Sequence, residues 1–312
     1  MHSKLSNEIK AEALRLGFSA CGIARAEAVN TDNTETFTQW LDAKGNANMD
    51  YMGNHLDKRL NPELLMTGVK SIVSVAMNYA PAQQIPKDQY QFAAYAYGKD
   101  YHDIVKKKLF LLADSIKQLT ADTHPSFNYR CFCDSAPVLE RYWALQAGIG
   151  WIGRNHQLII PKAGSMFVLG ELFLDFELEY NHPMKNKCGD CQRCLDVCPT
   201  KVLSTHPFDA ARCLSYQLIE NRQELSEETR EKMGNFIYGC DRCQQACPWN
   251  SFAQPTDISE MQPSEEFLDM TKEKWENLTL EDYRRIFKGS AVKRVKYEGL
   301  MRNIDAAKKN GK

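Results

Sequence analysis

Seven of the eleven cysteines in this chain of 312 residues fall in two short runs. The first run, residues 188–199, reads CGDCQRCLDVCP and follows the bacterial iron–sulfur spacing C-x2-C-x2-C-x3-C-P at every position. In that pattern three closely spaced thiolates bind one 4Fe-4S cluster, and the cysteine before the proline binds a second one. The sequence therefore predicts two 4Fe-4S clusters in this region.

The second run, residues 240–248, is one ligand short, because Ile237 stands where its first cysteine is expected. Two clusters need about eight thiolates, and the one further cysteine between the runs is Cys213. We assign Cys213 as the missing ligand. The predicted ligands of cluster one are Cys188, Cys191, Cys194 and Cys247, and those of cluster two are Cys198, Cys213, Cys240 and Cys243.

Two other uses of these cysteines are weaker. Paired cysteines can bind zinc, but a zinc ion takes four ligands, and the tight triplet followed by Cys-Pro favours a cluster. Disulfides are disfavoured because the spacings are ligand spacings and nothing in the chain suggests secretion. Outside the runs, Cys21, Cys131 and Cys133 are interpreted as small buried side chains, with metal binding by Cys131 and Cys133 as the alternative.

The overall composition is typical of a soluble globular protein with room for two domains, with 43% hydrophobic and 25% charged residues. The net charge of −1 does not by itself indicate a nucleic-acid partner. The first residues lack the apolar core of a signal peptide, and no run of apolar residues is long enough to span a membrane. We therefore expect a cytoplasmic location and no membrane contact.

The elements that must position these residues alternate between helix and strand in the first half of the chain. Apolar periodicity predicts helices at 4–16, 35–43 and 102–119, with Thr34 as the N-cap of the second. Short apolar or alternating runs predict strands at 18–24, 127–133 and 172–178, and a half-buried strand at 73–79.

Asp134 follows the strand at 127–133 and precedes a helix expected to start near Pro137. A carboxylate at the end of a strand is well placed for catalysis. It is equally well placed to cap a helix, and the residue types favour a cap by Asp134 or Ser135.

Three glycines, Gly148, Gly150 and Gly153, predict a tight turn where backbone can approach a ligand. They spell G-x-G-x-x-G but follow a helix rather than a strand, so they are not read as a dinucleotide fingerprint. Near the other end of the chain, residues 288–312 carry eight Lys or Arg against two acids. Such a basic run is either a solvated helix face or a phosphate-binding patch.

Several stretches together resemble the epoxyqueuosine reductase family. They are residues 58–65 (KRLNPELL), 95–102 (YAYGKDYH), 134–141, 150–155, 164–171, both cysteine runs with Cys213 between them, and 289–303. The resemblance runs from about residue 5 to 305, and the combination is specific although each block alone is not. Two small departures are Arg154 where lysine is expected and Asn61 where aspartate is expected. The chain resembles the short form of the family, without a helical-repeat extension.

The resemblance implies an enzyme that reduces epoxyqueuosine to queuosine at the wobble position of tRNA, the last step of queuosine synthesis. It implies base-off cobalamin, fed with electrons by the two clusters, and a proton-donor role for Asp134. We expect an α+β chain with three parts. They are an α/β cobalamin-binding domain with a sheet flanked by helices (1–178), a ferredoxin-like two-cluster domain (179–254), and a helical C-terminal segment with a basic end (255–312).

The resemblance also suggests individual contacts and partners. Predicted cobalamin contacts are Arg59, Tyr97, Arg141, Gly153, Gly164 and Ser165. Predicted phosphate contacts to the anticodon loop are Lys293, Arg294, Lys296 and Arg302. We expect a monomer served by an unidentified low-potential electron donor.

Two alternatives are a relative of the cobalamin-dependent reductive dehalogenases and a plain two-cluster electron carrier. A carrier does not need the nearly two hundred residues that precede the clusters, and no twin-arginine signal of an exported dehalogenase is present. The cobalamin-ligand motif D-x-H-x-x-G begins at Asp100 but fails at Val105, which argues against a histidine ligand on cobalt.

Overall fold

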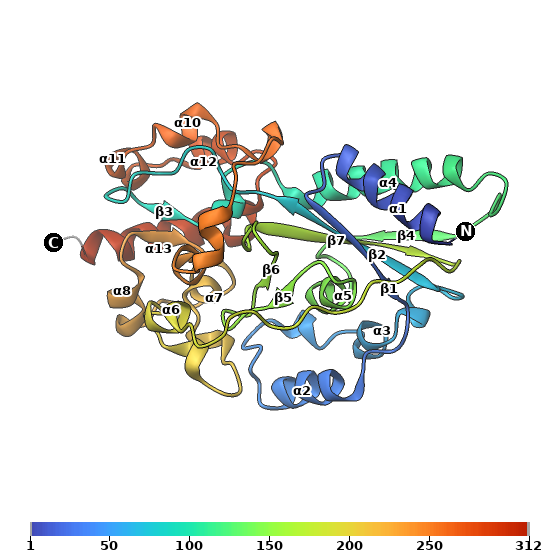
Figure 1. Ribbon diagram of the computed structural model, residues 1–312. Coiled ribbons are helices and arrows are strands. Elements are labelled where there is room, and N and C mark those ends of the chain that lie inside the picture. The colour runs from blue at the N-terminus through green and yellow to red at the C-terminus, as the bar shows by residue number, and fades with distance from the viewer. Residues whose placement is uncertain (1, 311–312) are drawn as a thin grey trace.

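An antiparallel sheet forms the centre of the N-terminal half of the molecule (Figure 1). The computed structural model describes residues 2–310, and within them this sheet has four strands in the order β1-β2-β7-β4. The strands are β1 (Ala20–Arg25), β2 (Ser71–Asn78), β7 (Phe167–Leu174) and β4 (Tyr129–Phe132). Neighbouring strands pair antiparallel throughout.

Helices cover both faces of this sheet. On one side lie α1 (His2–Arg15) and α4 (Tyr101–Leu119), and on the other side lies α5 (Glu140–Gln146), with α2 (Thr31–Asp42) and α3 (Leu56–Leu60) beyond it (Figure 1). Along β2, Val73 and Val75 pack into the core under α1 and α4, whereas Ile72 packs with Trp143 of α5. The predicted sheet flanked by helices is therefore confirmed.

Three local predictions need correction. Strand β2 is buried on both faces from Ser71 to Met77, so it is a central strand rather than the half-buried one expected. The strand expected at 172–178 begins earlier and is β7, which pairs along its whole length with β2. Helix α2 begins at Thr31 because the Asn30 side chain accepts the backbone N–H of Asn33, so the cap is Asn30 and not Thr34.

Short elements build the cysteine-rich part. Helices α6 (Arg193–Asp196) and α9 (Arg242–Gln245) lie inside the two cysteine runs and contact each other, and α7 (Leu214–Ile219) follows Cys213. Strand β8 (Phe236–Tyr238) pairs in parallel with β3 (Gln91–Phe92), which joins this part to the N-terminal half. A small antiparallel hairpin is made by β5 (Trp151–Ile152) and β6 (Leu158–Ile159), and α8 spans Glu227–Met233.

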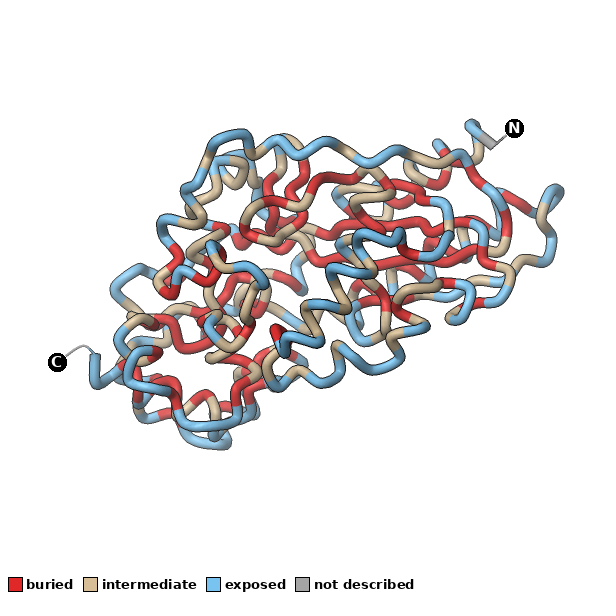
Figure 2. Tube along the Cα trace, turned by 90° about the horizontal axis from the view of Figure 1, so that it is seen from below, coloured by how far each residue is buried: buried red, intermediate tan, exposed pale blue. Residues whose placement is uncertain are grey.

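The C-terminal segment is helical, as predicted, and it packs onto both other parts. Its helices are α10 (Glu265–Leu268), α11 (Lys272–Glu276), α12 (Leu280–Ile286) and α13 (Lys296–Asn310). The rings of Phe267, Trp275 and Phe287 surround Phe92 of β3. One main core thus continues from the sheet into the C-terminal helices (Figure 2). No helix within residues 2–310 is long and apolar enough to cross a membrane.

Candidate active site and cluster centres

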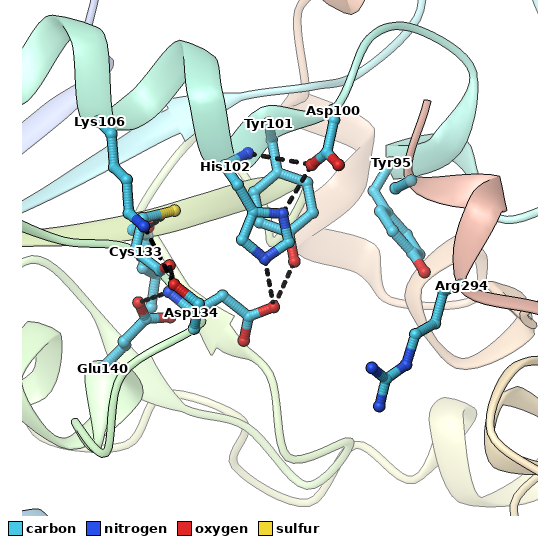
Figure 3. Close-up of polar contacts among 12 residues, drawn as sticks. Tyr95, Asp100, Tyr101, His102, Lys106, Cys133, Asp134, Glu140 and Arg294 are labelled. Carbon is cyan, nitrogen blue, oxygen red and sulfur yellow. Dashed lines mark hydrogen bonds and ion pairs between the residues drawn. The ribbon is translucent and has the colours of Figure 1, made fainter. Parts of the chain in front are cut away.

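Asp134 lies just beyond the end of β4 and does not cap a helix. Helix α5 begins at Glu140, and its N-cap position is occupied by Leu139, which has no polar side chain. The Asp134 backbone is left-handed, with φ +54, a conformation that few residues other than glycine adopt. Its Oδ2 accepts a hydrogen bond from the Tyr101 hydroxyl at 2.6 Å and one from His102 Nε2 at 3.1 Å (Figure 3). The capping interpretation is therefore wrong for Asp134, and the same helix start excludes Ser135.

The first turn of α4 supplies both of these donors. The Asp100 side chain caps α4 by accepting the backbone N–H of His102, and it also holds His102 Nδ1 at 2.6 Å. Carboxylates at both ring nitrogens raise the pKa of His102 to about 9, so the ring is an imidazolium at neutral pH. The hydrogen bond from His102 in turn lowers the pKa of Asp134. At neutral pH the shared proton therefore resides on His102.

Tyr101 keeps its proton as well. Burial and the neighbouring Asp134 carboxylate raise the pKa of its hydroxyl well above the ordinary value. The Tyr101 ring stacks on the His102 ring, with centroids 4.3 Å apart. Two donors from one helical turn thus hold the Asp134 carboxylate.

Charged groups from distant segments face Asp134 from the other side. Arg294 donates to both carboxylate oxygens of Glu220 at 2.8 Å and lies 5.5 Å from the centre of the Tyr51 ring. Arg294 and Tyr95 lie opposite Asp134, whose own side chain is exposed (Figure 3). The Arg294 charge contributes to the lowered pKa of Asp134, which places the two groups within electrostatic reach.

Two of the predicted cofactor residues have polar groups that suit an absent ligand. Arg59 is buried and donates from Nη2 to the Tyr51 carbonyl at 3.0 Å, but its buried Nε has no partner among the described residues. Arg141 has an exposed side chain, and yet desolvation lowers its pKa. Its Nη1 donates to the His156 carbonyl oxygen, which fixes the position of the guanidinium. An organic cofactor with polar side chains fits these donors.

The other four predicted cofactor residues make contacts within the protein itself. Tyr97 is buried, with its ring 5.3 Å from that of Phe267 in the main core. A Cβ on Gly153 would meet the side chain of Ile159, so this glycine serves the close approach within the β5–β6 hairpin. The Gly164–Ser165 turn packs on the cysteine-rich part, where Ser165 N–H donates to Asn250 Oδ1 at 2.6 Å.

The cysteines gather in the two predicted sets. Cys188, Cys191, Cys194 and Cys247 line one cavity of about 360 Å³, together with Trp249 and Phe252. Burial raises the pKa of the Cys243 thiol, and Cys240, Cys213 and Cys198 add to that shift by repulsion, so these four also lie together. Cys213 therefore stands in the second set, where the sequence predicted it.

The first set is arranged around a volume rather than around a point. Within residues 2–310, no group of three or more His, Cys, Asp or Glu side chains is placed to hold a single metal ion. Zinc needs its thiolates about 2.3 Å from one centre, whereas a 4Fe-4S cluster is itself a body with one thiolate at each iron. A cavity lined by four thiols fits the cluster.

The predicted phosphate contacts fall into two kinds. Lys293, in the short 3-10 helix Ala291–Val295, and Lys296, the first residue of α13, are both exposed, and Arg294 belongs to the site described above. Arg302 is instead committed to the protein, because its guanidinium donates to the carbonyls of Gln217, Asn221 and Gln223 at the end of α7. Arg302 therefore holds two segments together.

Sequence reasoning missed Tyr101 and His102 as partners of Asp134, although both lie in a stretch singled out for its resemblance. It also missed Glu140 and Glu171, which lie behind Asp134. The sequence offered one signal for this pair. Glu171 is a carboxylate inside the apolar run 166–174, which is typical of a core strand.

Comparison with known proteins places this geometry in a family. Residues 59–135 match the family model described as epoxyqueuosine reductase QueG, DUF1730, and residues 187–250 match that of a 4Fe-4S double cluster binding domain. The epoxyqueuosine reductase of Cellulophaga algicola is 41% identical, with 98% of each chain covered.

Two solved structures agree. Epoxyqueuosine reductase from Streptococcus thermophilus is 30% identical with a TM-score of 0.85, over 99% of this chain and 82% of that one. An epoxyqueuosine reductase solved with an epoxyqueuosine-modified tRNA-Tyr stem loop is 27% identical with a TM-score of 0.86, over 98% of this chain and 81% of that one. The segment 187–250 is thus a two-cluster 4Fe-4S domain, and the chain belongs to the epoxyqueuosine reductase family.

Proposed function

We propose that this protein reduces epoxyqueuosine to queuosine at the wobble position of tRNA, using base-off cobalamin and two 4Fe-4S clusters. Family membership supports the reaction, and a relative solved with an epoxyqueuosine-modified stem loop supports the substrate. The observation that carries the proposal is the placement of Asp134, an exposed carboxylate held by an imidazolium and lying opposite Arg294.

The eight cysteines are proposed as cluster ligands in the two sets given above. The clusters would carry single electrons from a low-potential donor toward the site, and bound cobalamin would supply a strongly reducing and nucleophilic cobalt centre. Arg59 and Arg141 would hold the polar periphery of the cofactor. His102 has both ring nitrogens engaged by Asp100 and Asp134, which accords with a base-off form that has no histidine ligand.

The proton requirements of the reaction match the residues around Asp134. Turning an epoxide into an alkene with release of water consumes two electrons and two protons. His102, with its pKa raised to about 9, holds the proton at neutral pH and would pass it through the 3.1 Å hydrogen bond to Asp134 as Asp134 protonates the departing oxygen. Water would supply the second proton. Tyr101 keeps the Asp134 carboxylate oriented.

The tRNA would approach from the C-terminal side. Lys293 and Lys296 would contact phosphates, while Arg294 lies at the site itself, and the modified base would be extruded from the anticodon loop toward Asp134. Arg302 is left out of this proposal because its donors already serve backbone carbonyls. We further propose a cytoplasmic monomer with the three domains 1–178, 179–254 and 255–312.

The test is turnover by the anaerobically reconstituted protein with cobalamin, a low-potential reductant and tRNA carrying epoxyqueuosine. Queuosine should form only when cobalamin is present, and Asp134→Asn should lose nearly all turnover while retaining both clusters. Asp103→Asn, an exposed aspartate in the first turn of α4, is the matched control and should behave as wild type. Undiminished turnover by Asp134→Asn would remove the proton-donor role, and no product from protein with both clusters and bound cobalamin would contradict the function.

A further inference from the structure

A buried carboxylate lies in the middle of the main sheet, behind the Asp134 loop. Glu171 is on the central strand β7, where it pairs with Ser74 of β2 on one side and with Phe132 of β4 on the other, and it is fully buried. Ser74 Oγ donates to Glu171 Oε1 at 3.3 Å. No donor from the described part of the chain reaches Oε2. A buried carboxylate oxygen without a donor is costly, so its presence needs an explanation.

The neighbour that can supply the missing hydrogen bond is a second carboxyl group. Glu140, the first residue of α5, packs from the same face of the sheet and lies within hydrogen-bonding reach of Glu171. Glu171 is fully buried and Glu140 is half-buried, and two desolvated carboxyls in contact cannot both be ionised without strong repulsion. A single proton shared between them removes that repulsion and gives Glu171 Oε2 its donor.

Glu140 is also the direct link to the loop that carries Asp134. Its Oε1 accepts the backbone N–H of Asp134 at 2.5 Å (Figure 3). Because Asp134 has the left-handed backbone described above, an external hydrogen bond is needed to hold its peptide group in place. The Glu140 carboxyl group provides that bond.

Other charged groups around the pair have opposing effects. Burial and Asp134 raise the pKa of Glu140 to about 8, against the opposing effect of His102 of α4 and Arg141 of α5. Burial and Glu140 raise the pKa of Glu171 well above its ordinary range. Lys106 of α4 donates to Ser135 Oγ on the same loop, and β2 contributes the uncharged Ser74. At neutral pH the pair therefore retains a proton.

We propose that Glu140 and Glu171 share a proton and act together as positioning residues that hold the Asp134 loop in its active conformation. This inference rests on the proposed function, since it assigns the pair to the loop that delivers the proton. Loss of the shared proton leaves two repelling carboxylates beneath the loop. Glu140 then moves away from the Asp134 N–H, and Asp134 loses its alignment with Tyr101 and His102.

The first test is the pH dependence of kcat, measured by steady-state turnover. Wild-type activity should begin to fall near pH 8, below the pH at which His102 loses its proton. Glu140→Gln keeps the acceptor oxygen and carries no charge, so it should retain neutral-pH turnover within about threefold and begin to fall only near pH 9. Glu140→Ala should lose about tenfold in kcat with little change in KM. Glu12→Gln, a glutamate of α1 that accepts a hydrogen bond from Ser115 near the far end of α4, is the matched control and should follow wild type.

An alkaline limb that is unchanged in Glu140→Gln would overturn the proposal, and so would an Ala variant as active as Gln. A second readout needs no turnover, so it separates this inference from the proposed function. Infrared spectra of the resting protein between pH 7 and 10 should show a protonated carboxyl that disappears as the pH rises. The signal should be missing from Glu140→Gln/Glu171→Gln at pH 7. If the double variant does not fold, Glu140→Gln alone is compared with wild type for loss of the same pH-dependent signal. An identical spectrum in wild type and variant would overturn proton sharing.

Discussion

His102 and Asp134 share a hydrogen bond of 3.1 Å, from Nε2 of the imidazolium to Oδ2 of the carboxylate, while Asp100 holds the other ring nitrogen. The two residues come from elements that the chain brings together only through packing of α4 on the sheet. This pairing makes His102 the proton store, while the Asp134 side chain remains exposed.

Replacing His102 by Gln should lower kcat by about tenfold to a hundredfold, because Asp134 then lacks a neighbour that restores its proton. Wild-type activity, which begins to fall near pH 8 through the Glu140–Glu171 pair, should fall further in a second limb near pH 9, where His102 loses its charge. That limb should be absent from His102→Gln, as measured by turnover from pH 6 to 10. A variant that keeps the limb near pH 9 would assign it to another group.

The same residue predicts a pH dependence of stability. The pKa of His102 is raised from 6.5 to about 9 on folding, so its stabilising contribution is full below about pH 6.5 and is lost as the pH rises through 9. The expected loss is about 1–2 kcal/mol of unfolding free energy after solvent screening. Urea denaturation at pH 6.5 and pH 9.5 measures it, and His102→Gln should lose less stability across that interval than wild type does.

Cys213→Ser should remove cluster two, because it takes away the ligand that replaces the absent cysteine at position 237. After reconstitution the iron content should fall from about eight to about four atoms per chain. Cys131→Ser, a partly buried cysteine on β4, should keep the full complement. Full iron binding by Cys213→Ser would mean that another side chain completes cluster two.

Arg59→Gln should weaken cobalamin binding by about tenfold, because the unpartnered buried Nε is removed from a site that it is proposed to serve. Titration followed by the visible absorbance of the cofactor measures this without turnover. Arg15→Gln, an arginine of α1 paired with Glu12, is the control and should bind as wild type. Equal affinity in the Arg59 variant would leave its buried Nε without a role in cofactor binding.

The basic C-terminal residues should separate into two classes. Lys293→Ala and Lys296→Ala should each weaken tRNA binding, lower its salt dependence by about one counterion, and leave the unfolding free energy unchanged. Arg302→Ala should instead cost about 2–3 kcal/mol of stability, because three backbone carbonyls lose their donor. Filter binding at several salt concentrations and urea denaturation distinguish the two. A stable Arg302→Ala with weakened tRNA binding would return this residue to the phosphate contacts.

What the amino-acid sequence determined by itself is the chemistry whose pattern is local. The ligand spacing of residues 188–199 and 240–248 predicted two 4Fe-4S clusters, since cluster ligands close together in space are also close together in the chain. Helix α4 was predicted to within one residue because its apolar period and its polar start are both written in consecutive residues. The family was recognised from blocks of the same local kind.

Only the tertiary structure decided which residues meet across the fold. Spacing favoured Asp134 as a cap because Asp is a common cap, whereas the start of α5 at Glu140 and the packing of α4 turned its carboxylate toward His102. Tyr97 was suggested as a cofactor contact by the resemblance alone, and only the packing of the C-terminal helices showed that its ring lies beside Phe267 in the core. The proposed role of Glu171 became visible only from the register of β7 and from its contact with Glu140, which lies 31 positions earlier in the chain. Such pairs depend on the sheet register and on helix packing, which many distant residues determine together and no local pattern encodes.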